Sequence, residues 1–125
     1  MDIYSKLREK KMLLIDDDEW IRDSLSIFFE AEGCHIHTLE TAEEGLEILK
    51  HQPYDIIIVD YRLPGMDGLD FLRRIKGQYP NSIKILITAY GDKEIAYEAR
   101  QLGVNDFIEK PFTTTTIEAS LSLLL

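Results

Sequence analysis

The side chains best suited to chemistry in this sequence stand directly after short strand-like runs. They are the acidic pair Asp16 and Asp17 after Met12–Ile15, Asp60 after Ile56–Val59, Thr88 after Ile83–Ile87, and Lys110 after Val104–Glu109. Three carboxylates close together repel one another unless a cation neutralises them, and an oxygen-only site suits Mg²⁺, which keeps several waters and binds phosphate. A hydroxyl and an ammonium suit an anion held on one of the carboxylates. These residues predict a magnesium-assisted phosphate site if the fold gathers the ends of the runs.

The stretch from Asp55 to Asp70 contains the central candidate, Asp60. Four β-prone residues at 56–59 run directly into this carboxylate, and a short apolar run bounded by turn residues is typical of a strand buried on both faces. The following LPGMDG favours a turn, with Asp67 placed to cap the next helix. Asp60 is therefore expected at the carboxyl end of a central strand, where open α/β sheets bind ligands. Taken alone, an aspartate in this position is more often a loop cap.

Strand-like and helix-like segments alternate five times along the chain, which predicts a parallel sheet with helices on both faces. Three expected strands are nearly all apolar and belong in the middle of the sheet: 12–15, 56–59 and 83–87. The other two are interrupted by polar residues and belong at its edges: 34–38 and 104–109. The pattern predicts a flavodoxin-like (βα)5 fold, a doubly wound parallel five-stranded sheet of order 2-1-3-4-5. In that order Asp16, Asp17 and Asp60 converge between neighbouring strands.

Capping residues mark the expected helix boundaries. The candidates for helix starts are Asp18, Asp67, the four threonines at 113–116, and Thr41, which with Glu44 has the form of a capping box. Gly33 and Gly103 are placed to end helices. Asp18 is accordingly interpreted as a cap rather than a metal ligand.

Composition bounds the class of protein. A chain of 125 residues is one domain with room for a sizeable core, and 14 basic against 23 acidic residues, net −9, argue against nonspecific nucleic-acid binding. Cys34 is the only cysteine, which excludes an intramolecular disulfide and a cysteine-based zinc cluster, and strand alternation separates it from His35 and His37. No apolar run approaches membrane-spanning length and the N-terminus lacks a signal-peptide core, so a soluble, cytoplasmic protein is expected.

The sequence resembles a response-regulator receiver domain of two-component signal transduction. The matching residues are the acidic pair Asp16-Asp17, Asp60 in VDYRLPGMDG, Thr88 in LITAYG and Lys110 in EKPF, over about Met12 to Leu125. Each motif is weak alone, but all occur in order at the expected strand ends. The expected organisation is an N-terminal extension at 1–10, with one or two helical turns, and a receiver domain at 11–125.

The resemblance implies a phosphoacceptor site that uses Mg²⁺. Asp60 would take a phosphoryl group from a phosphohistidine, giving an acyl phosphate. Asp17 would bind Mg²⁺ directly and Asp16 mainly through water. Asp60 itself and the backbone carbonyl of Arg62 would be further ligands. Such a domain promotes its own phosphorylation and slow autodephosphorylation, and is not a turnover enzyme acting on an external substrate.

The resemblance also implies a switch. Thr88 would donate a hydrogen bond to a phosphoryl oxygen, and Lys110 would pair with Asp60 and then with the phosphate. Phe107 falls where the family carries a switch aromatic, although a phenylalanine on an edge strand is also ordinary core. The Lys110–Pro111 peptide bond is expected to be cis.

The implied partner is a sensor histidine kinase or a phosphotransfer protein, without direct contact to nucleic acid or membrane. A homodimer formed on phosphorylation and a covalently attached output domain outside this chain are both left open. A haloacid-dehalogenase-type phosphatase would need a second aspartate two residues after the nucleophile, where this chain has Arg62. A degenerate receiver acting as an interaction module would have lost site residues that are present here, and DDDEW after the first strand excludes a flavodoxin-type phosphate loop.

Overall fold

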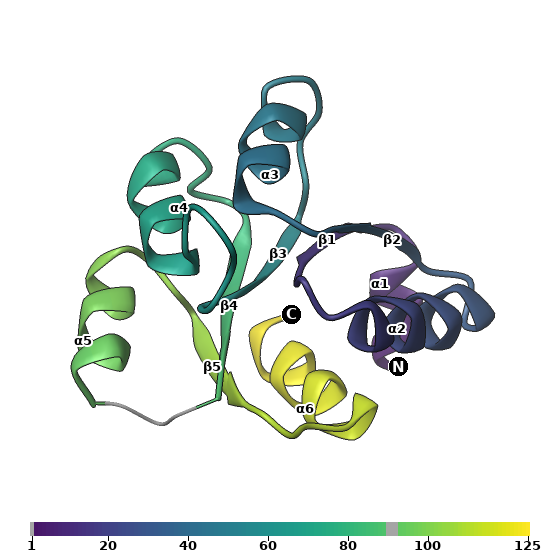
Figure 1. Ribbon diagram of the computed structural model, residues 1–125. Coiled ribbons are helices and arrows are strands. Elements are labelled where there is room, and N and C mark those ends of the chain that lie inside the picture. Colours follow the sequence, from purple (N-terminus) through teal and green to yellow (C-terminus); the bar gives the residue numbers. More distant parts are fainter. Residues whose placement is uncertain (1, 90–92) are drawn as a thin grey trace.

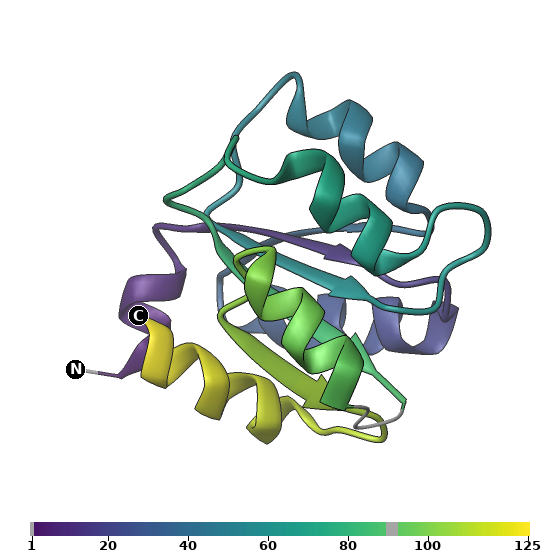
Figure 2. The same ribbon diagram turned by 90° about the vertical axis from the view of Figure 1, so that its left-hand side faces the viewer.

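A parallel five-stranded sheet lies at the centre of the molecule, with helices on both faces (Figure 1, Figure 2). The computed structural model describes residues 2–89 and 93–125. The strands are β1 (Lys11–Ile15), β2 (His35–Leu39), β3 (Ile56–Asp60), β4 (Ile83–Thr88) and β5 (Asp106–Glu109). The helices are α1 (Ile3–Leu7), α2 (Glu19–Ala31), α3 (Ala42–Leu49), α4 (Gly68–Ile75), α5 (Lys93–Gln101) and α6 (Thr114–Leu124). No helix within these ranges is long and apolar enough to cross a bilayer.

The strand order is β2-β1-β3-β4-β5, which confirms the predicted topology. All neighbouring strands are parallel, and β1 pairs with both β2 and β3. The apolar strands β1, β3 and β4 lie inside and the polar-interrupted ones at the edges, because an inner strand is covered by helices on both faces. The carboxyl ends of all five strands therefore meet at one edge of the sheet (Figure 2).

The two edge strands begin later than their sequence patterns indicated. Cys34 donates its N–H to the carbonyl of Phe29, and Val104 donates to Ala99, so both residues close the preceding helix instead of joining the sheet. Gly33 and Gly103, with φ of 80° and 91°, turn the chain at these two helix ends. This is the hydrogen-bond pattern of a glycine-terminated helix, which confirms the predicted helix ends and explains why both strands start late.

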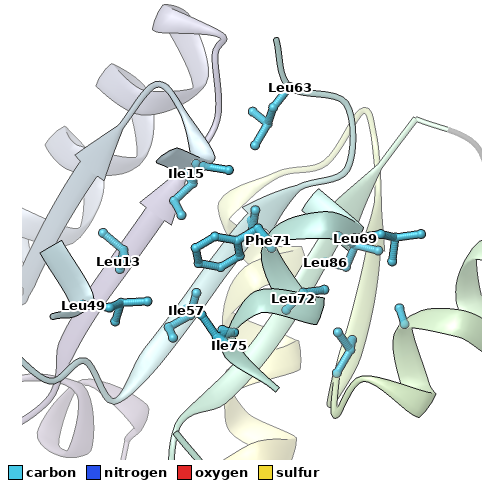
Figure 3. Close-up of a cluster of buried hydrophobic side chains, with 14 of the residues drawn as sticks. Leu13, Ile15, Leu49, Ile57, Leu63, Leu69, Phe71, Leu72, Ile75 and Leu86 are labelled. Carbon is cyan, nitrogen blue, oxygen red and sulfur yellow. The ribbon is translucent and has the colours of Figure 1, made fainter. Parts of the chain in front are cut away.

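Two apolar clusters hold the layers together, one on each face of the sheet. Helices α3, α4 and α5 cover one cluster, in which Phe71 of α4 lies between Ile15 of β1 and Ile57 of β3 (Figure 3). Helices α2 and α6 cover the other, together with α1. Both clusters contain residues of the inner strands, so the strand ends are held rigidly from both sides.

Side-chain caps begin most of the helices. Asp18 accepts from the N–H groups of Trp20 and Ile21, which confirms its predicted role as a cap, and Asp67 caps α4 in the same way. In α3 the Thr41 side chain accepts from the Glu44 N–H at 3.1 Å, as in a capping box. The Glu44 carboxylate accepts from the Thr41 hydroxyl, whereas in a capping box it would accept from the Thr41 N–H. The reciprocal backbone contacts of a capping box form in α6, between the threonines 113 and 116.

Helix α1 packs against the end of the molecule where both chain termini lie (Figure 2). Leu7 is fully buried in the cluster beneath α2 and α6. Lys6 Nζ donates to the carbonyl of Leu125 at 3.1 Å, and Arg8 Nε donates to the carbonyl of Glu32 at 2.8 Å. The segment before β1 thus contacts the ends of two helices that cover the same face of the sheet.

Candidate functional site

The acidic residues predicted to form a site do converge at the carboxyl edge of the sheet. Asp60 is the last residue of β3, and Asp16 and Asp17 directly follow β1, its neighbour. One carboxylate oxygen from each of the three lies within 4.8 Å of the others. Asp16 and Asp60 are buried, whereas Asp17 is exposed, so the pocket opens to solvent on the side of Asp17.

Lys110, which directly follows β5, lies at ion-pair distance from two of these carboxylates. Its Nζ lies 3.0 Å from Asp60 Oδ2 and 3.3 Å from Asp16 Oδ2. The Lys110 N–H donates to the carbonyl of Thr88 at 2.8 Å, which continues the β4–β5 pairing by one residue. The Lys110–Pro111 peptide bond is cis, as predicted. The hydrogen bond to Thr88 and the two ion-pair contacts hold the lysine beside the pocket.

Thr88 and Phe107 occupy the neighbouring strands. Thr88 is buried at the end of β4, one residue beyond Ile87, the partner of Asp60. Phe107 on β5 is half-buried, packs against the cluster beneath α4 and α5, and lies under the Arg100 guanidinium, 5.5 Å from the ring centroid. This placement fits both interpretations of Phe107. The last two residues of the LITAYG motif lie outside the described residues.

Three hydrogen bonds fix the buried Asp16. The Asp16 N–H donates to the Leu39 carbonyl at 3.0 Å, and Asp16 Oδ1 accepts from the Asp18 N–H at 2.9 Å. Arg22 Nη1 donates to the Asp16 carbonyl at 2.9 Å. Sequence reasoning did not find Arg22, because an arginine on the second turn of a helix carries no signal that it folds back onto the preceding strand end.

Gly68 allows the chain to fold closely over Asp60. Its N–H donates to the Tyr61 carbonyl at 2.8 Å, and a Cβ atom at this position would lie 2.4 Å from the Asp60 carbonyl oxygen. That neighbour is backbone and cannot move aside cheaply. The glycine is therefore required by the close approach of α4 to the end of β3.

Burial and repulsion shape the charges of the pocket. Burial, reinforced by the charge of Asp16, raises the pKa of Asp60 to about 6, although Lys110 opposes the shift. Burial also raises the pKa of Asp16. Burial acts to lower the pKa of Lys110, but the two carboxylates outweigh it and hold that pKa above its ordinary value. A single lysine is too little positive charge for three carboxylates.

The donor set of the pocket fits a hard divalent cation. Asp16 Oδ2 is buried and accepts no hydrogen bond from the described residues, although Lys110 lies at ion-pair distance. All three side chains offer oxygen, which is the ligand that Mg²⁺ and Ca²⁺ prefer. A cation there would satisfy the Asp16 oxygen and reduce the repulsion that adds to the effect of burial on the pKa of Asp60.

The fold and the pocket define a doubly wound α/β domain with an acidic site at its topological switch point. The family model of the response regulator receiver domain matches residues 12–122, and the chain belongs to this family. Receiver domains are signalling domains of two-component systems and not turnover enzymes. The probable chemotaxis protein CheY of Rhizobium etli is 35% identical over 125 residues, which cover 97% of this chain and 94% of the relative.

Longer proteins and solved structures are also similar. Transcriptional regulatory protein FixJ of Bradyrhizobium diazoefficiens is 34% identical over 108 residues, which cover 86% of this chain. The match spans 53% of FixJ, so the chain covers about half the length of that relative. A response regulator from Burkholderia pseudomallei, solved with a phosphorylated aspartic acid, a calcium ion and citrate, has a TM-score of 0.82 and 25% identity, covering 90% of this chain and 66% of that one.

Proposed function

We propose that this receiver domain accepts a phosphoryl group on Asp60 from the phosphohistidine of a sensor histidine kinase or a phosphotransfer protein, with Mg²⁺ bound beside it. The observation that carries the proposal is the position of Asp60, buried at the end of β3 with two carboxylates within 4.8 Å and Lys110 at 3.0 Å. The Burkholderia pseudomallei response regulator was solved with a phosphorylated aspartic acid and a calcium ion, which supports an aspartate acceptor and a bound divalent cation here.

The proposed reaction needs little from the protein beyond position and charge. A carboxylate oxygen of Asp60 forms a bond to phosphorus while the bond from phosphorus to the donor nitrogen breaks, and that electron pair stays with the imidazole. Lys110 passes from Asp60 to a phosphoryl oxygen, and the Thr88 hydroxyl donates to another. Asp17, Asp16 through water, and the Arg62 carbonyl would hold Mg²⁺, which supplies positive charge to the phosphoryl oxygens.

Phosphorylation is expected to require Mg²⁺, because the pocket otherwise repels an incoming anion. The chain should gain the mass of one phosphoryl group on incubation with acetyl phosphate and MgCl₂, and should gain none when EDTA replaces the metal. Intact-mass spectrometry measures both reactions. Equal labelling in EDTA would contradict the proposed role of the carboxylate cluster.

The proposed switching face consists of α5, β5 and α6, roughly residues 92–125. Asp92 itself lies outside the described residues. A phosphoryl group would draw Thr88 inward and leave room for Phe107 to change rotamer, which repacks the surface between α5 and β5. Glu118 is the only ionisable side chain of α6, so a homodimer through this face would rest on leucines. An output domain attached outside this chain would read the same face.

Beryllofluoride tests the switch because it mimics a phosphoryl group on a carboxylate. Amide chemical shifts around Asp60 and across 93–125 are expected to move together on its addition, and sedimentation will show whether a dimer forms. If only the residues around Asp60 respond, the domain binds phosphate without the proposed switch.

A further inference from the structure

The loop between β3 and α4, residues 61–67, carries Arg62, whose backbone carbonyl is one of the proposed Mg²⁺ ligands. One end of this loop is tied to the sheet edge, and its two ends are tied to each other. The Tyr61 N–H donates to the Ile87 carbonyl and the Gly68 N–H donates to the Tyr61 carbonyl, each at 2.8 Å. The ends are therefore fixed, and the conformation of the middle depends on other contacts.

Glu43 reaches the middle of this loop from a different element. Its Oε2 accepts a hydrogen bond from the Met66 N–H at 3.2 Å. Glu43 is exposed in the first turn of α3, and this turn is itself anchored by the fully buried Ala42. The carboxylate thus links a rigid helix to the backbone of the loop.

Gly65 makes room for this contact. A Cβ atom on residue 65 would lie 2.6 Å from Glu43 Oε2, and the φ of 74° also favours glycine there. The chain turns at Gly65, which leaves the next N–H, that of Met66, directed at the carboxylate. The turn at Gly65 and the position of the Glu43 carboxylate together allow the hydrogen bond from Met66.

We infer that Glu43 is a positioning residue for the phosphoacceptor site. Its carboxylate holds the backbone of 61–67 in the conformation that lets the Arg62 carbonyl serve the metal, while making no contact with the reacting atoms. The inference rests on the proposed function of Asp60. It assigns a role in the reaction to a surface glutamate that lies on another helix, 17 residues before the acceptor in the chain.

The adjacent Glu44 provides a matched comparison. It stands in the same first turn of α3, is also exposed, and carries the same charge towards the positive end of the helix. Its carboxylate accepts from the hydroxyl of Thr41 and stays on its own helix. Replacement of Glu44 reproduces the loss of charge near the helix N-terminus without removing the hydrogen bond to the loop.

Three variants separate the hydrogen bond from the charge. Glu43→Ala removes both, Glu43→Gln keeps an oxygen acceptor without the charge, and Glu44→Ala removes charge from the same turn. Two readouts are measured on each: amide hydrogen exchange of Met66 in the metal-free protein, and Mg²⁺ affinity by calorimetric titration. Phosphorylation by acetyl phosphate is then followed at limiting and at saturating Mg²⁺.

In Glu43→Ala the Met66 amide is expected to exchange faster, and the Mg²⁺ affinity is expected to fall about 3- to 10-fold. This loss is at or below the usual effect of removing a hydrogen-bond partner of a metal ligand. It is small because both ends of the loop stay tied. Phosphorylation should be slower at limiting Mg²⁺ and normal at saturation. Glu43→Gln and Glu44→Ala should both stay within about twofold of wild type for Mg²⁺.

Unchanged Mg²⁺ affinity in Glu43→Ala would overturn the inference, as would a Glu43→Gln variant as weak as Glu43→Ala, because charge and not the hydrogen bond would then be responsible. A wild-type chain that binds no Mg²⁺ would overturn the proposed function itself. The two failures are distinguishable, since the first leaves a normal wild-type titration and the second leaves none.

Discussion

The Asp60→Asn variant is expected to be more stable than the wild type by about 2–3 kcal/mol at pH 8 in the absence of Mg²⁺. Asp60 is buried beside Asp16, and its pKa is raised from 3.8 to about 6 in the folded chain. A shift of about two pKa units corresponds to about 3 kcal/mol of unfavourable interaction in the ionised form. The neutral amide removes that cost, so the ionised carboxylate of the proposed acceptor lowers the stability of the metal-free domain.

The sign of the pH dependence follows from the raised pKa. As pH falls through about 6, the folded wild type takes up a proton on Asp60 before the unfolded chain does, so its stability rises relative to the variant. The difference should be nearly gone below about pH 4. Urea unfolding at pH 8, 6 and 4 in EDTA measures it, with Asp23→Asn on the exposed side of α2 as the matched control. A variant no more stable than wild type at pH 8 would contradict the expectation.

The Leu7→Ala variant is expected to lose about 2–5 kcal/mol of stability, the usual cost of removing a fully buried leucine side chain. Leu7 has no exposed surface and lies in the cluster beneath α2 and α6. The same unfolding measurement applies, and Ser5→Ala on the exposed side of α1 should change little. A loss below about 0.5 kcal/mol would show that α1 is a dispensable extension of the domain and not part of its core.

The strand order could be predicted from sequence because burial leaves a direct pattern. A strand covered on both faces, such as Ile56–Asp60, is apolar at nearly every position, whereas His35–Leu39 at the edge is not. Exact strand starts could not be predicted. Cys34 and Val104 read as strand residues, yet their N–H groups are used to close the preceding helices, and residue type does not reveal that competition.

The acidic residues of the site could also be predicted, because position at a strand end and residue type together define them. The contacts that hold the backbone around them could not. Arg22 and Glu43 act through a backbone carbonyl and a backbone N–H that belong to other elements, and no periodicity links a side chain to such a partner. The packing of α1 was missed for the same reason, since three apolar residues at helical spacing do not indicate which surface covers them.

The identity of the phosphorylated residue tests the central claim most directly. Wild type and Asp60→Asn are incubated with acetyl phosphate and Mg²⁺, digested, and the phosphorylated peptide is located by mass spectrometry. We expect one phosphoryl group, on Asp60, and no label in Asp60→Asn. Full labelling of the variant, or a wild-type label on another residue, would contradict the assignment of Asp60 as the phosphoacceptor.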